Sequence, residues 1–349
     1  MAKRIRSFMA LAAAVFATVA ASGGRAAEFD GVTVRINSYG GGFDQVLKDT
    51  VATPLKQKFG MNVAYEPGTS SEALSKLIAA KENPHLDVLM IDSANMPVAI
   101  ENGVIEELSE EDLPALKDLH PQAREFGKYG ASFIYGPMAL SYNKDRVKNP
   151  PASYKDLAKP EYKGQVAIFN LENNGGIITL LALAEANGGG VTNVAPAFEF
   201  LKQIKPNLVA TPAANSALVQ LFLQNEATVA ANWTGRILAL QAEGFPIEMV
   251  VPSEGLYSGL SYVNVVKGTK NRAAAIKYIE QQLTPAAQQG MAEKFFYPPT
   301  NSKVQLSEGL AKKVVLYGAD RSKMRTIDWA AVAQNRSAWL EEWNRVMRQ

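Results

Sequence analysis

The chain has 349 residues, with 36 Lys and Arg against 34 Asp and Glu, two His and no Cys. Without Cys it can form no disulfide, no thiolate zinc site and no thiol nucleophile. Residues 1–26 hold four of the basic residues and no acid, so the rest carries 32 basic against 34 acidic residues, a net charge of −2. A nearly neutral chain gives no reason to expect nucleic-acid or anionic-membrane partners.

The first 26 residues have the pattern of a secretory signal peptide. Basic residues at positions 3, 4 and 6 precede an apolar stretch of 14 residues over 8–21, and small residues follow at 24 and 26. This stretch is too short for a transmembrane anchor, which needs about 20 apolar residues. We expect cleavage after Ala26. Since no Cys is present for lipid attachment, we expect a free periplasmic protein that does not insert in the membrane.

The first half of the remaining chain alternates predicted strands with predicted helices. Strands are expected over 31–37, 62–66 and 86–91, and helices over 44–59 and 72–80. This alternation predicts an α/β sheet with ligands beyond the carboxyl ends of the strands. Ser38 to Gly41 and the pair Asp92 and Ser93 follow two of these strands. The glycine triplet 40–42 precedes a helix, and we interpret it as an anion cradle.

An extended segment over 133–143 contains a Gly-Pro break and predicts a crossing into a second lobe. Further strands are expected over 165–169, 228–232, 248–252 and 261–265, and helices over 154–158, 176–187, 195–204, 217–224 and 271–283. A chain of this length usually forms two domains. We predict an α/β fold with lobe 1 formed by 27–137 and 260–305 and lobe 2 by 138–259 and 306–349, with crossings near 135–140 and 255–262.

Motifs of catalysis are missing from the sequence. The two His, at positions 85 and 120, are not spaced as metal ligands, and no hydrolase, dinucleotide-binding, phosphate-loop or metalloprotease motif occurs. We therefore expect no metal, no cofactor and no catalytic residues. The glycine triplet 188–190 directly follows a predicted helix and is interpreted as its C-terminal cap.

Several short segments together carry a family resemblance. They are Asp87–Ile91, Gly103–Leu108, Ala139–Lys144, Lys159–Gly164, Asn225–Trp233, Gly244–Ile247, Ala275–Ile279, Leu283–Pro285 and Tyr297–Asn301. In this order, over almost the whole mature chain, they resemble the spermidine/putrescine-type periplasmic binding proteins of ABC importers, which have the type II periplasmic-binding fold. The resemblance implies two lobes that close on a small ligand in the cleft and an inner-membrane ABC permease as partner. We expect a monomer.

The family's binding positions carry over one at a time. Trp233 matches the cleft tryptophan of the family. The family's aromatic residue after the first strand falls at about Ser38, which Tyr39 follows here. Its serine after the Asp-Val strand falls at Asp92.

Other family positions have lost their carboxylates. The acidic pair falls near Leu171 and Asn174, with Glu172 between them, and the late tryptophan and aspartate fall at Gly259 and Ser261. Polyamines need carboxylates for their ammonium groups and aromatic rings for their methylenes. These losses argue against a polyamine ligand, which is kept as the alternative.

Arg236, three residues beyond Trp233, departs from the pattern of the family and suggests a different ligand. Its planar guanidinium suits a carboxylate or phosphonate. With Asp92 or Glu172 opposite, it predicts a zwitterion such as an ω-amino acid or an aminoalkylphosphonate. Alternatively, Arg236 is a surface residue that pairs with a nearby glutamate.

Together, these arguments give twelve candidate ligand-binding residues. They are Ser38, Tyr39, Gly40, Gly41, Asp92, Ser93, Glu172, Asn174, Trp233, Arg236, Tyr257 and Ser261. Tyr257 is expected to cap the ligand or to lie at the surface near the hinge.

Structural and functional alternatives remain for these residues. Trp233 also fits simple core packing, and Asp92 with Ser93 also fits a helix N-cap. Ser216 is expected to cap the helix that follows it and to aim its amides into the cleft. At the level of the whole protein, the alternatives are a periplasmic sensor that feeds a receptor and an enzyme that uses Asp92 and Glu172 as acid and base.

Overall fold

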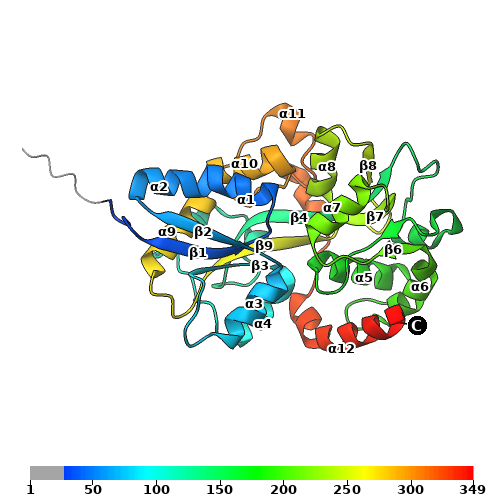
Figure 1. Ribbon diagram of the computed structural model, residues 1–349, viewed down its shortest axis with the longest axis horizontal. Coiled ribbons are helices and arrows are strands. Elements are labelled where there is room, and N and C mark those ends of the chain that lie inside the picture. The colour runs from blue at the N-terminus through cyan, green and yellow to red at the C-terminus, as the bar shows by residue number, and fades with distance from the viewer. Residues whose placement is uncertain (1–26, 349) are drawn as a thin grey trace, which may run out of the picture.

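The computed structural model describes residues 27–348, so the predicted signal peptide lies outside the described residues. The described chain is an α/β protein with two lobes side by side, as the sequence predicts (Figure 1). Within it, no helix is long and apolar enough to cross a membrane.

The N-terminal half builds the first lobe, on the left of Figure 1. Its strands are β1 (Thr33–Ser38), β2 (Asn62–Pro67) and β3 (Val88–Asp92), and its helices are α1 (Gly42–Leu47), α2 (Thr53–Phe59), α3 (Ser70–Ala79) and α4 (Met96–Glu101). β1 pairs in parallel with β2 and β3, and the first four residues of β3 are buried, as expected for an apolar run. The helix predicted over 44–59 is divided, because a π-helical turn at Lys48–Ala52 joins α1 to α2.

Two long strands connect the lobes. β4 (Ala131–Asn143) pairs with β9 (Ser258–Val265) through residues 131–137, and then with β7 (Val229–Trp233) through residues 138–142. β9 also pairs with β3 through residues 261–265. The strands of both lobes therefore belong to one mixed sheet in the order β2-β1-β3-β9-β4-β7-β5-β6, with β8 on β4.

The second lobe adds short strands and longer helices. They are β5 (Val166–Ala167), β6 (Leu208–Ala210), β8 (Ile247–Val250), α5 (Asn174–Ala186), α6 (Ala195–Ile204), α7 (Asn215–Leu223) and α8 (Thr234–Ala242). The strand predicted over 165–169 has only two residues, and the helix predicted over 154–158 is a 3-10 helix. Past α5, Gly188 has φ 80° and Gly189 N–H donates to the Ala184 carbonyl at 2.7 Å, which confirms the predicted C-cap.

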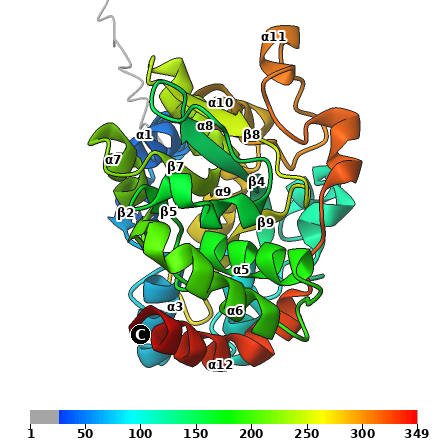
Figure 2. The same ribbon diagram turned by 90° about the vertical axis from the view of Figure 1, so that its right-hand side faces the viewer.

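The C-terminal part contains α9 (Arg272–Gln282), α10 (Pro285–Phe295), α11 (Glu308–Ala311) and α12 (Trp329–Arg348). Only α9 was expected from the sequence. α12 runs beneath the second lobe in Figures 1 and 2 and also contacts α4 of the first lobe. The final helix therefore touches both lobes.

Buried apolar residues form two cores. The first draws on residues 29–135 and 260–297, and the second mainly on residues 138–257 and 316–346. The chain changes core near 135–138 and again near 257–260, where β4 and β9 cross. These cores support the lobe boundaries given above, which stay a prediction.

Candidate ligand-binding cleft

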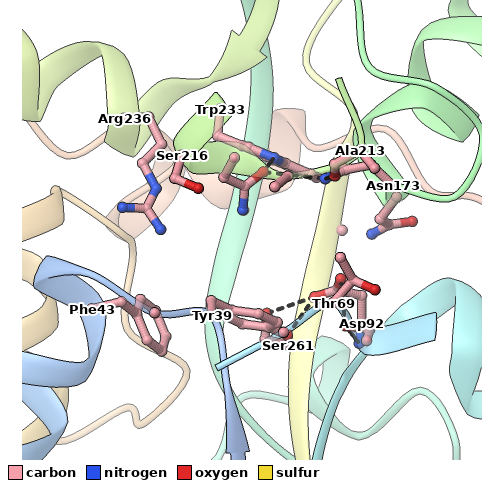
Figure 3. Close-up of a pocket in the computed structure, with 18 of the residues that line it drawn as sticks. Tyr39, Phe43, Thr69, Asp92, Asn173, Ala213, Ser216, Trp233, Arg236 and Ser261 are labelled. Carbon is pink, nitrogen blue, oxygen red and sulfur yellow. Dashed lines mark hydrogen bonds between the residues drawn. The ribbon is translucent and has the colours of Figure 1, made fainter. Parts of the chain in front are cut away.

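A cavity of about 490 Å³ lies between the lobes (Figure 3). It is lined by Tyr39, Gly40, Gly41, Phe43, Pro67, Gly68, Thr69, Ser70, Glu72, Asp92, Ile134, Gly136, Glu172, Asn173, Asn174, Ala213, Ala214, Asn215, Ser216, Trp233, Arg236, Gly259, Ser261 and Tyr297. The structure thus brings together nine of the twelve candidate residues. They come from strand ends and helix N-termini of both lobes, as the edge of such a sheet leads one to expect.

Asp92 is the half-buried acid of the first-lobe wall. Its Oδ1 accepts hydrogen bonds from Tyr39 Oη at 2.7 Å and Ser261 Oγ at 3.1 Å, and its Oδ2 accepts from Ser70 Oγ at 2.8 Å. Burial raises the pKa of Asp92, while these hydroxyls and the charge of Arg336 lower it. Asp92 does occupy the N-cap position of the turn Ser93–Asn95, but its side chain makes no capping bond there and instead accepts from the three hydroxyls.

The glycine loop after β1 also lines the first-lobe wall. Gly40 and Gly41 have φ values of 75° and 62°, a backbone shape that favours glycine. The Gly40 N–H donates to Asp44 Oδ1 at 3.0 Å, and Asp44 is itself buried. This amide is therefore already satisfied within the protein, which weakens the prediction of an anion cradle.

Arg236 lies in the first turn of α8, on the opposite wall. Figure 3 shows its guanidinium pointing into the cavity next to Ser216. Its Cζ lies 4.8 Å from the centre of the Phe295 ring, and its Nε is buried without a hydrogen-bond partner. In the described part of the chain no ion pair joins it to a glutamate or aspartate, so the surface-pair interpretation is wrong. Burial raises the pKa of neighbouring Tyr297, and the Arg236 charge opposes that shift.

Trp233 forms the inner part of the second-lobe wall at the end of β7. Its side chain is only 7% exposed and belongs to the second core, while part of it lines the cavity. Its Nε1 donates to Asn215 Oδ1 at 3.0 Å, and Asn173 Nδ2 donates to the same oxygen at 3.2 Å. Trp233 therefore packs in the core and lines the cavity, although the sequence posed these roles as alternatives.

The N-terminus of α7 faces the cavity. α7 begins at Asn215 and its N-cap is Ala214, which has no capping side chain. Ser216 therefore lies inside the first turn and is not the cap predicted from sequence. The loop before α7 is held by Asn173, whose Nδ2 donates to the Ala213 carbonyl at 2.7 Å.

Gly259 and Asn174 lie together at the floor of the cavity. A Cβ at position 259 would lie 2.2 Å from Asn174 Nδ2, so the asparagine occupies space that only glycine leaves free. Asn174 is 4% exposed and its Oδ1 has no hydrogen-bond partner. An unpaired acceptor therefore lies at the floor of the cavity.

Two exposed acids lie at the rim. Glu172 uses its backbone carbonyl to accept from Ser71 Oγ at 3.1 Å across the cleft. Glu72, which sequence reasoning did not single out, pairs with Lys76 at 2.6 Å. Among its lining residues the cavity thus has one half-buried carboxylate, at Asp92, and two exposed carboxylates that water screens.

Three candidate residues do not line the cavity. Ser38 is fully buried at the end of β1. Ser93 Oγ accepts from Leu260 N–H at 3.0 Å and so connects β3 to β9. Tyr257 is 1% exposed and donates to Glu185 Oε2 at 2.5 Å, so it packs inside the second lobe and does not cap the cavity.

Sequence reasoning missed several lining residues. One signal was available, since Thr69 three residues before Glu72 is typical of a helix start, and its side chain caps α3. Recognising it would have placed Ser70 at the start of the helix that follows β2. No comparable signal marks Asn215 or Tyr297.

Residues 27–348 contain no group of three side chains able to hold a metal ion.

Comparisons with known proteins agree with this architecture. Residues 50–316 match the family model described as bacterial extracellular solute-binding protein. The chain is 25% identical over 296 residues to the spermidine/putrescine-binding periplasmic protein of Escherichia coli, covering 81% of this chain and 83% of that one. It is 24% identical over 287 residues to a gamma-aminobutyric acid-binding protein of Pseudomonas aeruginosa, covering 79% of each.

Solved structures share the fold. A Clostridium perfringens ABC transporter structure is 25% identical with a TM-score of 0.71, covering 90% of this chain and 99% of that one. A periplasmic binding protein of Agrobacterium tumefaciens in complex with agropinic acid is 20% identical with a TM-score of 0.77, covering 91% and 99%. The two lobes therefore have the architecture of type II periplasmic binding proteins.

Proposed function

The chain belongs to the bacterial extracellular solute-binding proteins, the substrate-binding components of ABC importers, and from this premise we propose that it captures a short ω-amino acid such as 4-aminobutanoate. The observation that carries the proposal is a cavity with Arg236, which has no acidic partner among the described residues, on one wall and the half-buried carboxylate of Asp92 on the other.

The second-lobe wall suits the carboxylate of the ligand. A guanidinium offers donors in a fixed fork that matches a carboxylate or phosphonate. Arg236 is held by its contact with the Phe295 ring and has no acidic partner of its own in the described residues. The α7 N-terminus and Ser216 add partial positive charge and a hydroxyl on the same wall. A ligand carboxylate would give Arg236 its missing partner.

The first-lobe wall suits the ammonium group. A carboxylate has about four acceptor positions, and three at Asp92 are taken by Tyr39, Ser70 and Ser261. One position is left for an ammonium, which would also lie near the ring of Tyr39. The methylene chain between the two ends would lie along Trp233.

The named relatives support an amine-bearing ligand. One is called a gamma-aminobutyric acid-binding protein and another a spermidine/putrescine-binding protein. Polyamine binding is the second candidate, and the rim acids Glu72 and Glu172 favour it. A polyamine, however, would place a second ammonium against Arg236, and this repulsion makes us prefer the zwitterion.

We further propose that the protein reaches the periplasm through a cleaved signal peptide and acts there as a monomer. In this role it delivers ligand to an inner-membrane permease and catalyses no reaction. Growth on the ligand as nitrogen source, compared between strains with and without the gene, would separate import from a sensing role.

Calorimetry with a matched ligand series tests the proposal. The mature chain, residues 27–349, is titrated with 4-aminobutanoate, with putrescine, which has an ammonium in place of the carboxylate, and with butanoate, which lacks the ammonium. An aminoalkylphosphonate is included because it shares the same charges. We expect 4-aminobutanoate to bind at least about tenfold more tightly than putrescine or butanoate, since each of these lacks one charged contact. Tight putrescine binding with no heat from 4-aminobutanoate would replace the proposal with the polyamine candidate.

A further inference from the structure

Arg336 lies outside the cavity and connects the lobes from the C-terminal helix. α12 packs on the second core through Trp329, Val332, Trp339, Trp343 and Val346. The Arg336 side chain extends from this helix to the first lobe, where its Nη1 donates to Asn95 Oδ1 at 2.8 Å and its Nη2 donates to Ser71 Oγ at 3.0 Å. A helix anchored in one lobe thus hydrogen-bonds the other.

The same guanidinium also contacts the second lobe directly. Nη2 lies 3.4 Å from the carbonyl oxygens of Leu171 and Glu172, in the segment that leads into α5. Ser71 Oγ completes the group by donating to the Glu172 carbonyl. These contacts cross between lobes, so separating the lobes would break the bonds to Asn95 and Ser71 while α12 stays on the second core.

The position of Arg336 relates it to the candidate ligand site. Asn95 follows Asp92 by three residues in the turn after β3, and Ser71 follows Ser70, whose hydroxyl donates to Asp92. Arg336 thus holds the neighbours of two site residues, although it does not line the cavity itself. Its positive charge lowers the pKa of Asp92.

We propose that Arg336 is a positioning residue that stabilises the closed arrangement of the lobes and, through Asn95 and Ser71, holds the Asp92 wall in place for an ammonium ligand. The first part stands without a known ligand, whereas the second rests on the proposed function. Lysine cannot replace Arg336 fully, because its single ammonium cannot reach Asn95, Ser71 and the two carbonyls in the same planar arrangement.

The charge effect has a definite sign. The groups that act on Asp92 are the hydroxyls of Tyr39, Ser70 and Ser261 and the charge of Arg336, and all of them oppose the rise in pKa caused by burial. Tyr297 feels Asp92 but is neutral, because burial raises its own pKa. Removing Arg336 therefore raises the pKa of Asp92 further, and ammonium binding is lost at a higher pH.

Lobe closure is measured first, without ligand. The chain has no Cys, so a pair of substitutions at exposed positions, Gln57→Cys on α2 and Gln203→Cys on α6, allows clean labelling for energy transfer. Arg336→Met and Arg336→Lys are compared with Arg345→Met, which removes an exposed arginine of the same helix. We expect Arg336→Met to shift the ligand-free distribution toward longer separations, Arg336→Lys to shift it less, and Arg345→Met to leave it unchanged.

Binding is measured next, with putrescine and 4-aminobutanoate as probes over a range of pH. We expect Arg336→Met to weaken binding about tenfold at neutral pH, mainly through faster dissociation. As the pH is lowered, this variant should lose its affinity at a higher pH than the unmodified protein does. Circular dichroism and thermal melting verify that each variant is folded. If Arg336→Met is unfolded, the same binding measurements are made on Arg336→Lys.

The closure role of Arg336, its role at the Asp92 wall and the proposed function would each be contradicted by a different result. Unchanged lobe separation in Arg336→Met would overturn the closure part, whichever ligand binds. Unchanged affinity of Arg336→Met for both probes would overturn its role at the Asp92 wall. If neither probe binds the unmodified protein, the proposed function is wrong, and the labelled pair still decides whether Arg336 holds the lobes together.

Discussion

The two walls of the cleft differ in how completely they satisfy their charged groups. On the first-lobe wall, the Asp92 carboxylate accepts from three hydroxyls, and the charge of Arg336 lowers its pKa. On the second-lobe wall, Arg236 contacts an aromatic ring and has a buried, unpartnered Nε. Buried polar groups without partners are costly in folded proteins.

This difference indicates which wall depends more on the ligand. On the first-lobe wall, three hydroxyls already hold the Asp92 carboxylate before the ligand binds. An ammonium therefore adds only one more contact to this carboxylate. The guanidinium on the second-lobe wall has no acidic partner in the described part of the chain, so a ligand carboxylate would be its first anionic contact. We therefore expect changes on the Arg236 side to alter affinity more than changes on the Asp92 side.

The largest effect is expected for Arg236→Met. It removes the charge that would pair with the ligand carboxylate, and losing one partner of a buried charge pair costs about 2–5 kcal/mol. Affinity for 4-aminobutanoate should fall about 100-fold in calorimetry. Arg35→Met, which removes an exposed arginine 4.0 Å from Glu66, is the matched control and should leave affinity unchanged. Equal affinities in both variants would contradict the role of Arg236.

A smaller loss, about tenfold, is expected for Asp92→Asn. The amide keeps an acceptor for the surrounding hydroxyls but lacks the charge that attracts an ammonium. Butanoate separates this effect from general damage, because it has no ammonium and its weak binding should not change. If butanoate binding falls in parallel with 4-aminobutanoate binding, Asp92 supports the wall and does not contact the amine.

The pH dependence sharpens the comparison. An ammonium binds the ionised form of Asp92, so affinity is complete above the pKa of this group and declines as pH falls through it. Because burial raises that pKa, the decline should begin at a higher pH than for an ordinary aspartate. Putrescine is the suitable probe, since it has no carboxylate of its own to titrate. If putrescine affinity depends on pH in the same way in Asp92→Asn as in the unmodified protein, the titrating group is not Asp92.

The smallest effect is expected for Trp233→Phe. The ring remains, but the bond from Nε1 to Asn215 is lost, while Asn173 still donates to the same Asn215 oxygen. The free energy of unfolding should fall by about 1 kcal/mol in urea titrations. Affinity should change by less than about threefold, because the bond lies within the wall. A hundredfold loss of affinity would mean that the indole nitrogen contacts the ligand.

The sequence predicts those parts of the cleft that follow directly from strand ends. Asp92 after a buried apolar run and Trp233 after β7 are found this way, because the carboxyl ends of strands gather at one edge of the sheet. The extended crossing over 133–143 is found because a long apolar run contains a Gly-Pro break.

The remainder depends on contacts that sequence spacing does not encode. The environment of Asp92 is formed by Tyr39, Ser70 and Ser261, which are separated from it by up to 169 residues. The prediction of Tyr257 as a ligand cap is wrong because its position in a loop does not reveal that its hydroxyl donates a hydrogen bond to Glu185. Arg336 was not singled out, since the final helix itself was not predicted.

The shared sheet determines how the molecule can bend. β4 and β9 remain hydrogen-bonded to each other from 131 to 137 while each also pairs within a lobe. A separation of the lobes therefore flexes and twists this two-strand ribbon and need not peel its ladder apart. The lobes can then open and close repeatedly by bending at the ribbon, with its hydrogen bonds kept and without local unfolding.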